Sequence, residues 1–139
     1  MRWATRPRIH VDRAATAWLI TSYIDPDAEF VYVDDPADVP EDATAFDMRG
    51  CELTHVGVDV TFETVLRRYE LDDPVLWKIG EIVHQADVED DRFDAPEAAG
   101  LDRIVRALGV DHDDEQVRAL TATILTSLEQ YLRAESLRR

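Results

Sequence analysis

Cysteine and lysine are almost absent from this chain. The only cysteine among the 139 residues is Cys51, so an intramolecular disulfide and a metal site built mainly from thiolates are both excluded. Lys78 is the only lysine among 15 basic residues, and asparagine does not occur. Acidic residues number 30 and the net charge is −15, a composition typical of adaptation to high intracellular salt. Because a field of this sign repels phosphate backbones, we expect no nucleic-acid partner.

Long apolar stretches are missing as well. No run approaches the roughly 18 residues that a membrane-spanning helix needs. The N-terminal segment lacks the apolar core of a signal peptide. We therefore expect a cytoplasmic protein with no membrane partner. A chain of 139 residues, 45% of them hydrophobic, fits a single domain over residues 1–139.

The hydrophobic periodicity predicts an α+β domain that is mainly α, with about five helices and a small sheet of two to four short strands. We expect residues 1–10 to form an extended arm or an edge strand. The other predicted strands cover 29–33 and 44–48, and the predicted helices cover 12–24, 62–70, 74–88, 96–108 and 113–138.

Cap signals set the ends of these helices. Thr61 is a plausible N-cap, and Asp73 followed by proline is a second helix start. Gly109 has the position of a C-terminal cap. Asp113 and Gln116 have the spacing of a capping box.

The helix predicted over 74–88 carries potential metal ligands beside its apolar stripe. Glu81, His84 and Asp87 follow one another at intervals of three residues, so they form a ladder along one flank. His84 and Asp87 are nearer the apolar stripe and are expected to point inward. Glu81 lies further round the helix, so we expect it to support the ligands from outside or to face solvent.

Two further residues complete a candidate metal site. His55 lies in an irregular stretch and Glu63 in the first turn of the helix that follows it. With His84 and Asp87 they supply two imidazoles and two carboxylates, a set that suits zinc, iron(II) or manganese and can leave positions open for water or substrate. The alternative is that these are surface groups, since any histidine in so acidic a chain has carboxylates nearby by chance.

Arginines are concentrated near the N-terminus. Guanidinium groups bind oxyanions through paired hydrogen bonds, so Arg6, Arg8 and Arg13 form a candidate anion site. The alternative is that they pair with surface carboxylates. Asp12 directly precedes Arg13, and we expect the two to form a buried ion pair at the start of the first helix. With Glu81, Asp12 is also expected to support the metal ligands from outside the ligand set.

Cys51 and His55 are a second possible source of chemistry. A thiol beside an imidazole can serve as a nucleophile. A lone cysteine is more often a small buried hydrophobe.

Several sequence blocks together carry a family resemblance. They are WATRPRIHVDRAATAWLITSYIDPDAEFVYV, FDMRG, LTHVGVDVTFETVLRRYELDDPVL, IVHQADVEDD and APEAAGLDRIV. In this order, over roughly residues 3–108, they resemble the ChrB-type chromate resistance family, and more narrowly the C-terminal domain of ChrB regulators as a stand-alone domain. The resemblance implies a link to chromate or related oxyanion stress. In regulators of this family an additional N-terminal segment is expected to bind DNA.

The chain departs from the family at its thiols. Family members often have cysteine near the WLI motif and before the [ST]-F-[ED] motif, where this chain has Thr16 or its neighbours and Val60. Thiol-based chromate reduction is therefore not expected. The histidine and carboxylate positions of the resemblance are retained, and they are Asp12, His55, Glu63, His84 and Asp87.

These observations favour a metal-binding domain that serves chromate or oxyanion resistance as a sensor or an accessory detoxification protein. One alternative is a metal-dependent hydrolase or redox enzyme that acts on a small anionic substrate. Another is a structural or interaction domain. The expected partners are a metal ion or a small oxyanion, and a homo-oligomer stays open.

Overall fold

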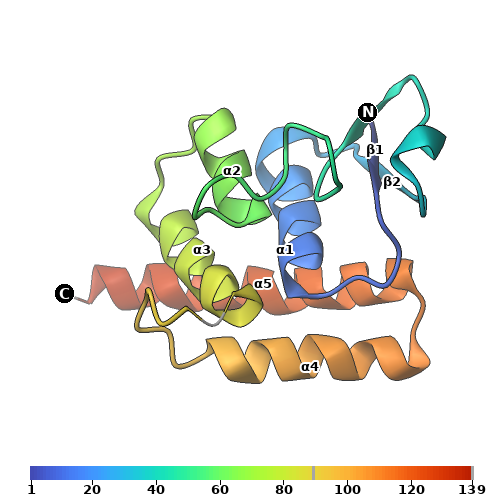
Figure 1. Cartoon of the computed structure of the whole chain (residues 1–139). Helices are drawn as coiled ribbons and strands as arrows, with labels where there is room; N and C mark the ends of the chain where they lie inside the picture. Colours follow the sequence, from blue (N-terminus) through green and yellow to red (C-terminus); the bar gives the residue numbers. More distant parts are fainter. Residues whose placement is uncertain (89, 139) are drawn as a thin grey trace.

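The computed structural model describes residues 1–88 and 90–138, and Figure 1 shows their arrangement. Within these ranges the strands are β1 (Arg2–Thr5), β2 (Glu29–Tyr32) and β3 (Ala43–Ala45). The α-helices are α1 (Val11–Leu19), α2 (Thr61–Arg68), α3 (Pro74–Asp87), α4 (Ala98–Asp111) and α5 (Asp114–Leu137). A π-helical segment, Ile20–Ile24, continues α1, and a 3-10 turn, Pro36–Asp38, follows β2. The predicted fold class, α+β and mainly α, is confirmed.

The three strands form a small parallel sheet in the order β2-β1-β3. Trp3 of β1 pairs with Phe30 on one side and with Thr44 on the other. The prediction of an N-terminal arm or edge strand was wrong, since β1 is the central strand and Trp3 is 1% exposed. Because the strands are parallel, the residues that follow all three lie at one edge, where open parallel sheets commonly bind ligands. We call it the carboxyl edge.

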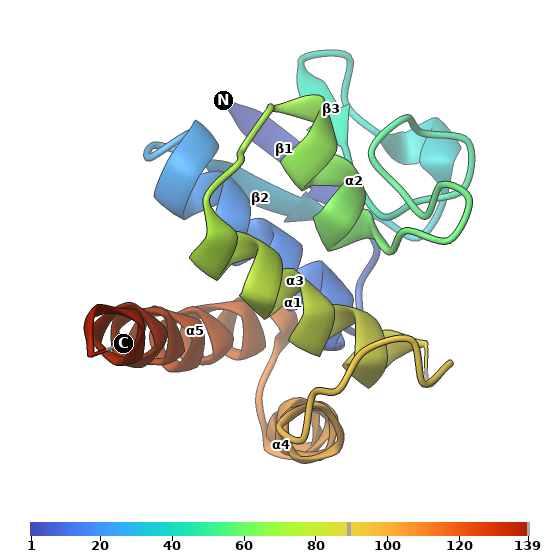
Figure 2. The same ribbon diagram turned by 90° about the vertical axis from the view of Figure 1, so that its left-hand side faces the viewer.

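Helices α1 and α3 form the centre of the helical layer. Each packs against the other and against α2, α4 and α5. Both views show α4 and α5 on the side of α1 and α3 that faces away from the sheet (Figures 1 and 2). Helix α1 is buried along almost its whole length, and Trp18 stacks on Phe62 of α2 with ring centroids 6.4 Å apart. No helix in the described ranges is long and apolar enough to cross a membrane.

The local cap signals gave mixed results. Asp73 caps α3, and Asp113 forms a capping box with Gln116 at the start of α5, as predicted. Thr61 is the first helical residue of α2 rather than its N-cap, which is Val60. Gly109 does not end α4, because the helix continues to Asp111.

Candidate metal site

Asp12 is the buried anchor of the candidate site. It lies in the first turn of α1, after β1, and is 2% exposed. Its carboxylate accepts hydrogen bonds from the backbone N–H groups of Thr61 (3.1 Å) and Phe62 (3.0 Å). These are the first two residues of α2, whose N–H groups have no partner within the helix. A negative charge is also favourable at the positive end of the helix dipole. The interaction fixes the Asp12 carboxylate against the start of α2.

His55 faces this carboxylate from the loop between β3 and α2. The loop turns back at Gly57, which has a φ of 62°, and Val56 pairs with Asp59 across the turn. The Nε2 atom of His55 lies 3.1 Å from Oδ2 of Asp12 and 3.2 Å from Oδ2 of Asp87. The side chain of His55 is 45% exposed, so one side of this cluster is open to solvent.

Asp87 completes a group of three with Asp12 and His55. It is the last residue of α3, and its side chain is 27% exposed. One potential ligand atom from each residue lies within 4.8 Å of the other two. Two ligand atoms bound 2.0–2.2 Å from one ion lie roughly 3.0–3.5 Å apart at tetrahedral or octahedral angles. The contacts of 3.1 and 3.2 Å fit this spacing. We call Asp12, His55 and Asp87 the triad.

The environment of the triad raises the pKa values of His55 and Asp87, so both residues tend to hold a proton. The hydrogen bond with Asp12 raises the pKa of His55 to about 9. Burial, reinforced by repulsion from Asp12, raises the pKa of Asp87 to about 6. Burial and the charge of Asp12 likewise raise the pKa of neighbouring Asp47. A cation placed among these carboxylates would relieve the same repulsion that now favours protonation.

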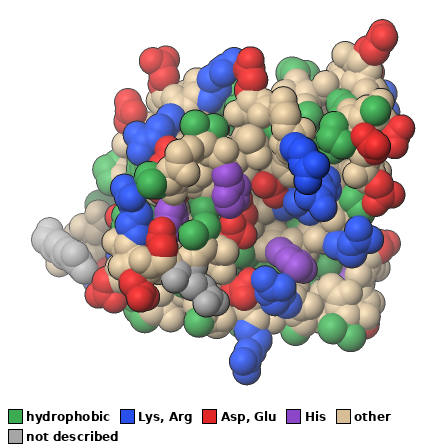
Figure 3. Space-filling model, in the orientation of Figure 1, with side chains coloured by type: hydrophobic (Ala, Val, Ile, Leu, Met, Phe, Trp, Pro, Cys, Tyr) green, Lys and Arg blue, Asp and Glu red, His purple; other side chains and the backbone are tan. Residues whose placement is uncertain are grey.

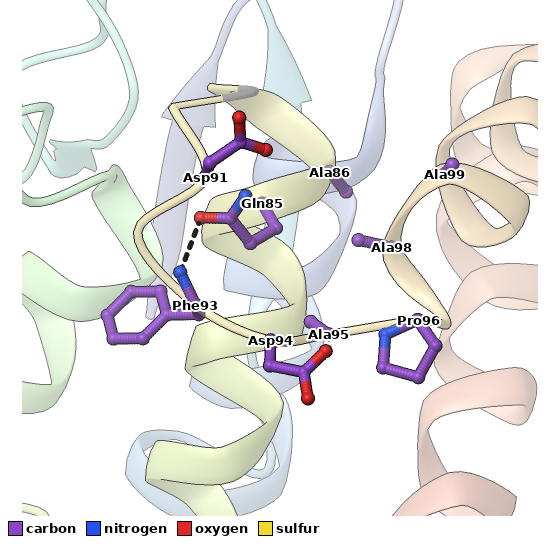
Figure 4. Close-up of a pocket in the computed structure, with 9 residues that line it drawn as sticks. All are labelled: Gln85, Ala86, Asp91, Phe93, Asp94, Ala95, Pro96, Ala98 and Ala99. Carbon is purple, nitrogen blue, oxygen red and sulfur yellow. Dashed lines mark hydrogen bonds between the residues drawn. The ribbon is translucent and has the colours of Figure 1, made fainter.

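His84 belongs to a separate, closed cluster. It is 0% exposed, and its Nδ1 lies 2.6 Å from Oε1 of Glu63 while its Nε2 lies 2.9 Å from Oδ2 of Asp90. Phe93 packs edge-on against the ring, with centroids 5.1 Å apart. The backbone N–H of Phe93 donates to Oε1 of Gln85 (3.0 Å), which ties the segment after α3 to the helix (Figure 4). Because carboxylates occupy both ring nitrogens, neither is available to a metal in this arrangement.

Asp47 lies beside the triad, at the carboxyl edge. Its Oδ1 accepts a hydrogen bond from Oγ1 of Thr61 (2.9 Å), and its Oδ2 from Nε of Arg13 (2.9 Å). The Arg13 guanidinium also donates to the carbonyl groups of Arg6 (3.3 Å) and Pro7 (3.1 Å). Arg13 is therefore engaged with protein groups, and its partner is Asp47 rather than the adjacent Asp12.

Comparison with known proteins shows the family to which the chain belongs. The pattern of the family described as ChrB, C-terminal domain, matches residues 3–132. The chain belongs to this family. It is similar to Protein ChrB of Cupriavidus metallidurans (strain CH34), with 44% identity over 88 residues. That match covers 63% of this chain and 27% of the relative. No solved structure matches the chain.

Within this ChrB C-terminal domain, the four predicted ligands fall into two pairs. His55 and Asp87 meet each other and Asp12, which we had predicted to support the site rather than to take part in it. Glu63 and His84 meet each other and Asp90. Glu81 lies 3.6 Å from Lys78, on a part-exposed stretch of α3.

The sequence interpretation overlooked Asp47 and Asp90. For Asp47 a signal exists, since it lies near the end of the predicted strand 44–48, and ligands commonly bind at the carboxyl ends of parallel strands. For Asp90 no pattern distinguishes it from the other acids that follow α3.

Cys51 does not pair with His55. Its thiol contacts the carbonyl groups of Met48 (3.1 Å) and Leu53 (3.5 Å), whereas His55 faces Asp12. Burial raises the pKa of the Cys51 thiol, which disfavours the thiolate that a nucleophile needs.

Proposed function

We propose that this domain binds a divalent metal ion, zinc, iron(II) or manganese, through Asp12, His55 and Asp87. The observation that carries the proposal is the approach of three ligand atoms to within 4.8 Å of one another from three separate segments of the chain. One imidazole and two carboxylates are a suitable ligand set for these ions. The proposed set replaces Glu63 and His84 of the sequence prediction with Asp12.

The surroundings of the triad support a bound cation in two ways. Asp12 is held by two backbone N–H groups, so one ligand is already oriented before metal binds. The part-exposed His55 and Asp87 leave room for water or a further ligand on the metal. Coordination would displace the protons that the raised pKa values of His55 and Asp87 indicate.

We further propose that the metal-bound domain serves resistance to chromate or a related oxyanion, as a sensor or an accessory detoxification protein. Membership of the ChrB C-terminal domain family supports this role, through the family's link to chromate resistance. The match covers only 27% of the ChrB relative, so the role is proposed for the domain and not for that whole protein.

Calorimetric titration with Zn²⁺ and Mn²⁺ tests the metal site. We expect the native chain to bind one ion per chain, and Asp87→Ala to weaken binding by at least about a hundredfold because a ligand is lost. Asp94→Ala is the matched control. Asp94 is also an exposed aspartate, in the segment that follows α3, but it lines a separate hollow of about 560 Å³ between α3 and α4 (Figure 4). Equal affinities in the native chain and Asp87→Ala, or no binding by the native chain, would overturn the proposal.

A further inference from the structure

Two arginines at the carboxyl edge lack a carboxylate partner. Acidic residues outnumber basic ones by 30 to 15, and arginines such as Arg2, Arg13 and Arg67 each form an ion pair. Across residues 1–88 and 90–138, neither an ion pair nor a hydrogen bond joins the side chain of Arg6 or Arg49 to another residue. In so acidic a chain, two free guanidinium groups near one another suggest a site for an external anion.

Arg6 and Arg49 line one surface cavity of about 430 Å³, together with Asp34, Asp35 and Pro36. Arg6 directly follows β1, the two aspartates follow β2, and Arg49 lies four residues after β3. The cavity is therefore built from the segments that leave all three parallel strands, where ligands commonly bind in open sheets. Figure 3 shows basic and acidic side chains intermixed on one face of the molecule.

The backbone that carries Arg6 is held in place. Arg13 donates hydrogen bonds to the carbonyl groups of Arg6 and Pro7 while its Nε is held by Asp47. The hydrogen bonds from Arg13 hold the segment just before Arg8, whose φ of 60° is an unfavourable backbone conformation. A loop fixed before binding loses less conformational entropy when a ligand arrives. In this arrangement Arg13 is a positioning residue, and Arg6 and Arg49 are free to bind.

The two aspartates of the cavity differ in what they already contact. The Asp35 carboxylate accepts a hydrogen bond from the backbone N–H of Ala37 (2.9 Å) and so caps the 3-10 turn. Asp34 is exposed at the cavity wall. A free carboxylate there repels an anion that has no proton, but it accepts a hydrogen bond from one that carries an O–H group.

We propose that this cavity binds a small tetrahedral oxyanion that carries a proton, with hydrogen phosphate as the representative. Arg6 and Arg49 donate charge-assisted hydrogen bonds to its unprotonated oxygens. Asp34 accepts the hydrogen bond from its O–H group and so disfavours sulfate, which has no proton near neutral pH. This site is distinct from the triad and does not rest on the proposed metal binding.

Calorimetric titration of the full chain with sodium phosphate and sodium sulfate, at pH 7, constant ionic strength and with a chelator present, tests the proposal. We expect phosphate to bind at least about tenfold more tightly than sulfate. Arg6→Ala and Arg49→Ala should each weaken phosphate binding by at least about tenfold. Arg103→Ala is the matched control, since it removes an exposed arginine of α4 that lines a different hollow, and it should change the affinity by less than about twofold.

A second variant isolates the role of the carboxylate. Asp34→Asn should strengthen sulfate binding until it lies within about threefold of phosphate binding, because the repelling charge is gone. The absence of phosphate binding, or equal losses of phosphate affinity in Arg49→Ala and Arg103→Ala, would show that the cavity is not the anion site. Equal binding of the two anions by the native chain would overturn the selectivity. Asp87→Ala should leave phosphate binding unchanged, so failure of the metal proposal and failure of this one are distinguishable.

Discussion

Two histidine–carboxylate clusters draw on the same turn of α3 and differ in how their histidines are enclosed. His84 is fully buried, and a carboxylate contacts each of its ring nitrogens. Three residues later, Asp87 meets the half-exposed His55, whose Nε2 faces two carboxylates at once. A buried histidine with both nitrogens engaged serves packing, whereas a part-exposed histidine that shares one nitrogen between two carboxylates brings three potential metal ligands together.

Both clusters also hold the start of α2. Asp12 of the triad accepts hydrogen bonds from the N–H groups of Thr61 and Phe62. In the closed cluster, Oε1 of Glu63 accepts the N–H of Val60 (3.0 Å) as well as facing His84. Because both clusters contact the start of α2, their different roles do not come from their places in the fold. The roles come from how the histidine of each cluster is enclosed. The same region carries a structural cluster and a candidate binding site.

The largest expected difference between the two clusters is in the free energy of unfolding that is lost when the histidine of each cluster is replaced. His84→Ala should lower the free energy of unfolding by about 3 kcal/mol or more, because it leaves a cavity and removes the partner of buried Glu63. His55→Ala should cost less than about 1 kcal/mol, since its side chain is 45% exposed. Urea denaturation of the metal-free proteins measures both values. Equal losses of unfolding free energy in the two variants would contradict the distinction between a closed structural cluster and an open one.

Metal affinity should show the reverse order. His55→Ala should weaken Zn²⁺ binding by at least about a hundredfold because it removes a ligand. His84→Gln keeps a polar side chain in the closed cluster and should change the affinity by less than about threefold. Calorimetry below the unfolding temperature of each variant checks this prediction. A greater loss of Zn²⁺ affinity in His84→Gln than in His55→Ala would place the metal in the closed cluster and contradict the proposed site.

The pH dependence of metal affinity sharpens the assignment. Metal displaces a proton from His55 below its pKa of about 9, and a second from Asp87 below its pKa of about 6. Affinity should therefore rise with pH, by about a hundredfold per unit below pH 6 and about tenfold per unit between pH 6 and 9. Competition with a chelator of known pH behaviour measures this profile. A flat profile from pH 5 to 8 would exclude the triad as ligands.

The smallest effect should come from Thr61→Val. This change removes the hydrogen bond to Asp47 and should lower the free energy of unfolding by about 1 kcal/mol. Because Asp47 lies beside the triad and is not among its three ligands, metal affinity should change by less than about threefold. Thermal unfolding and calorimetry on the same samples provide the two values. Loss of metal binding in Thr61→Val would extend the ligand set to Asp47.

Local sequence signals predicted the helices well and the sheet poorly. Asp73 with its proline, and Asp113 with Gln116, act within one helical turn, so spacing alone identifies them. The central position of β1 depends on pairing with residues 29–32 and 43–45, which no local pattern specifies. The edge-strand prediction failed for that reason.

The candidate site was partly predictable on the same grounds. The ladder on α3 predicted that His84 and Asp87 point inward. His84 is buried, whereas the side chain of Asp87 is 27% exposed. Helical spacing also does not say which partner each residue meets. Asp12 contacts His55 from 43 residues away because α1 and the start of α2 pack together. That contact is a product of tertiary structure, and it moved Asp12 into the proposed ligand set.

The most direct test is a crystal structure of the zinc-bound protein with anomalous scattering data collected at the zinc edge. The account predicts one strong peak about 2.0–2.2 Å from Nε2 of His55 and from a carboxylate oxygen of both Asp12 and Asp87. His84 should keep its contacts with Glu63 and Asp90. A peak on His84, or no peak within ligand distance of His55, would contradict the account.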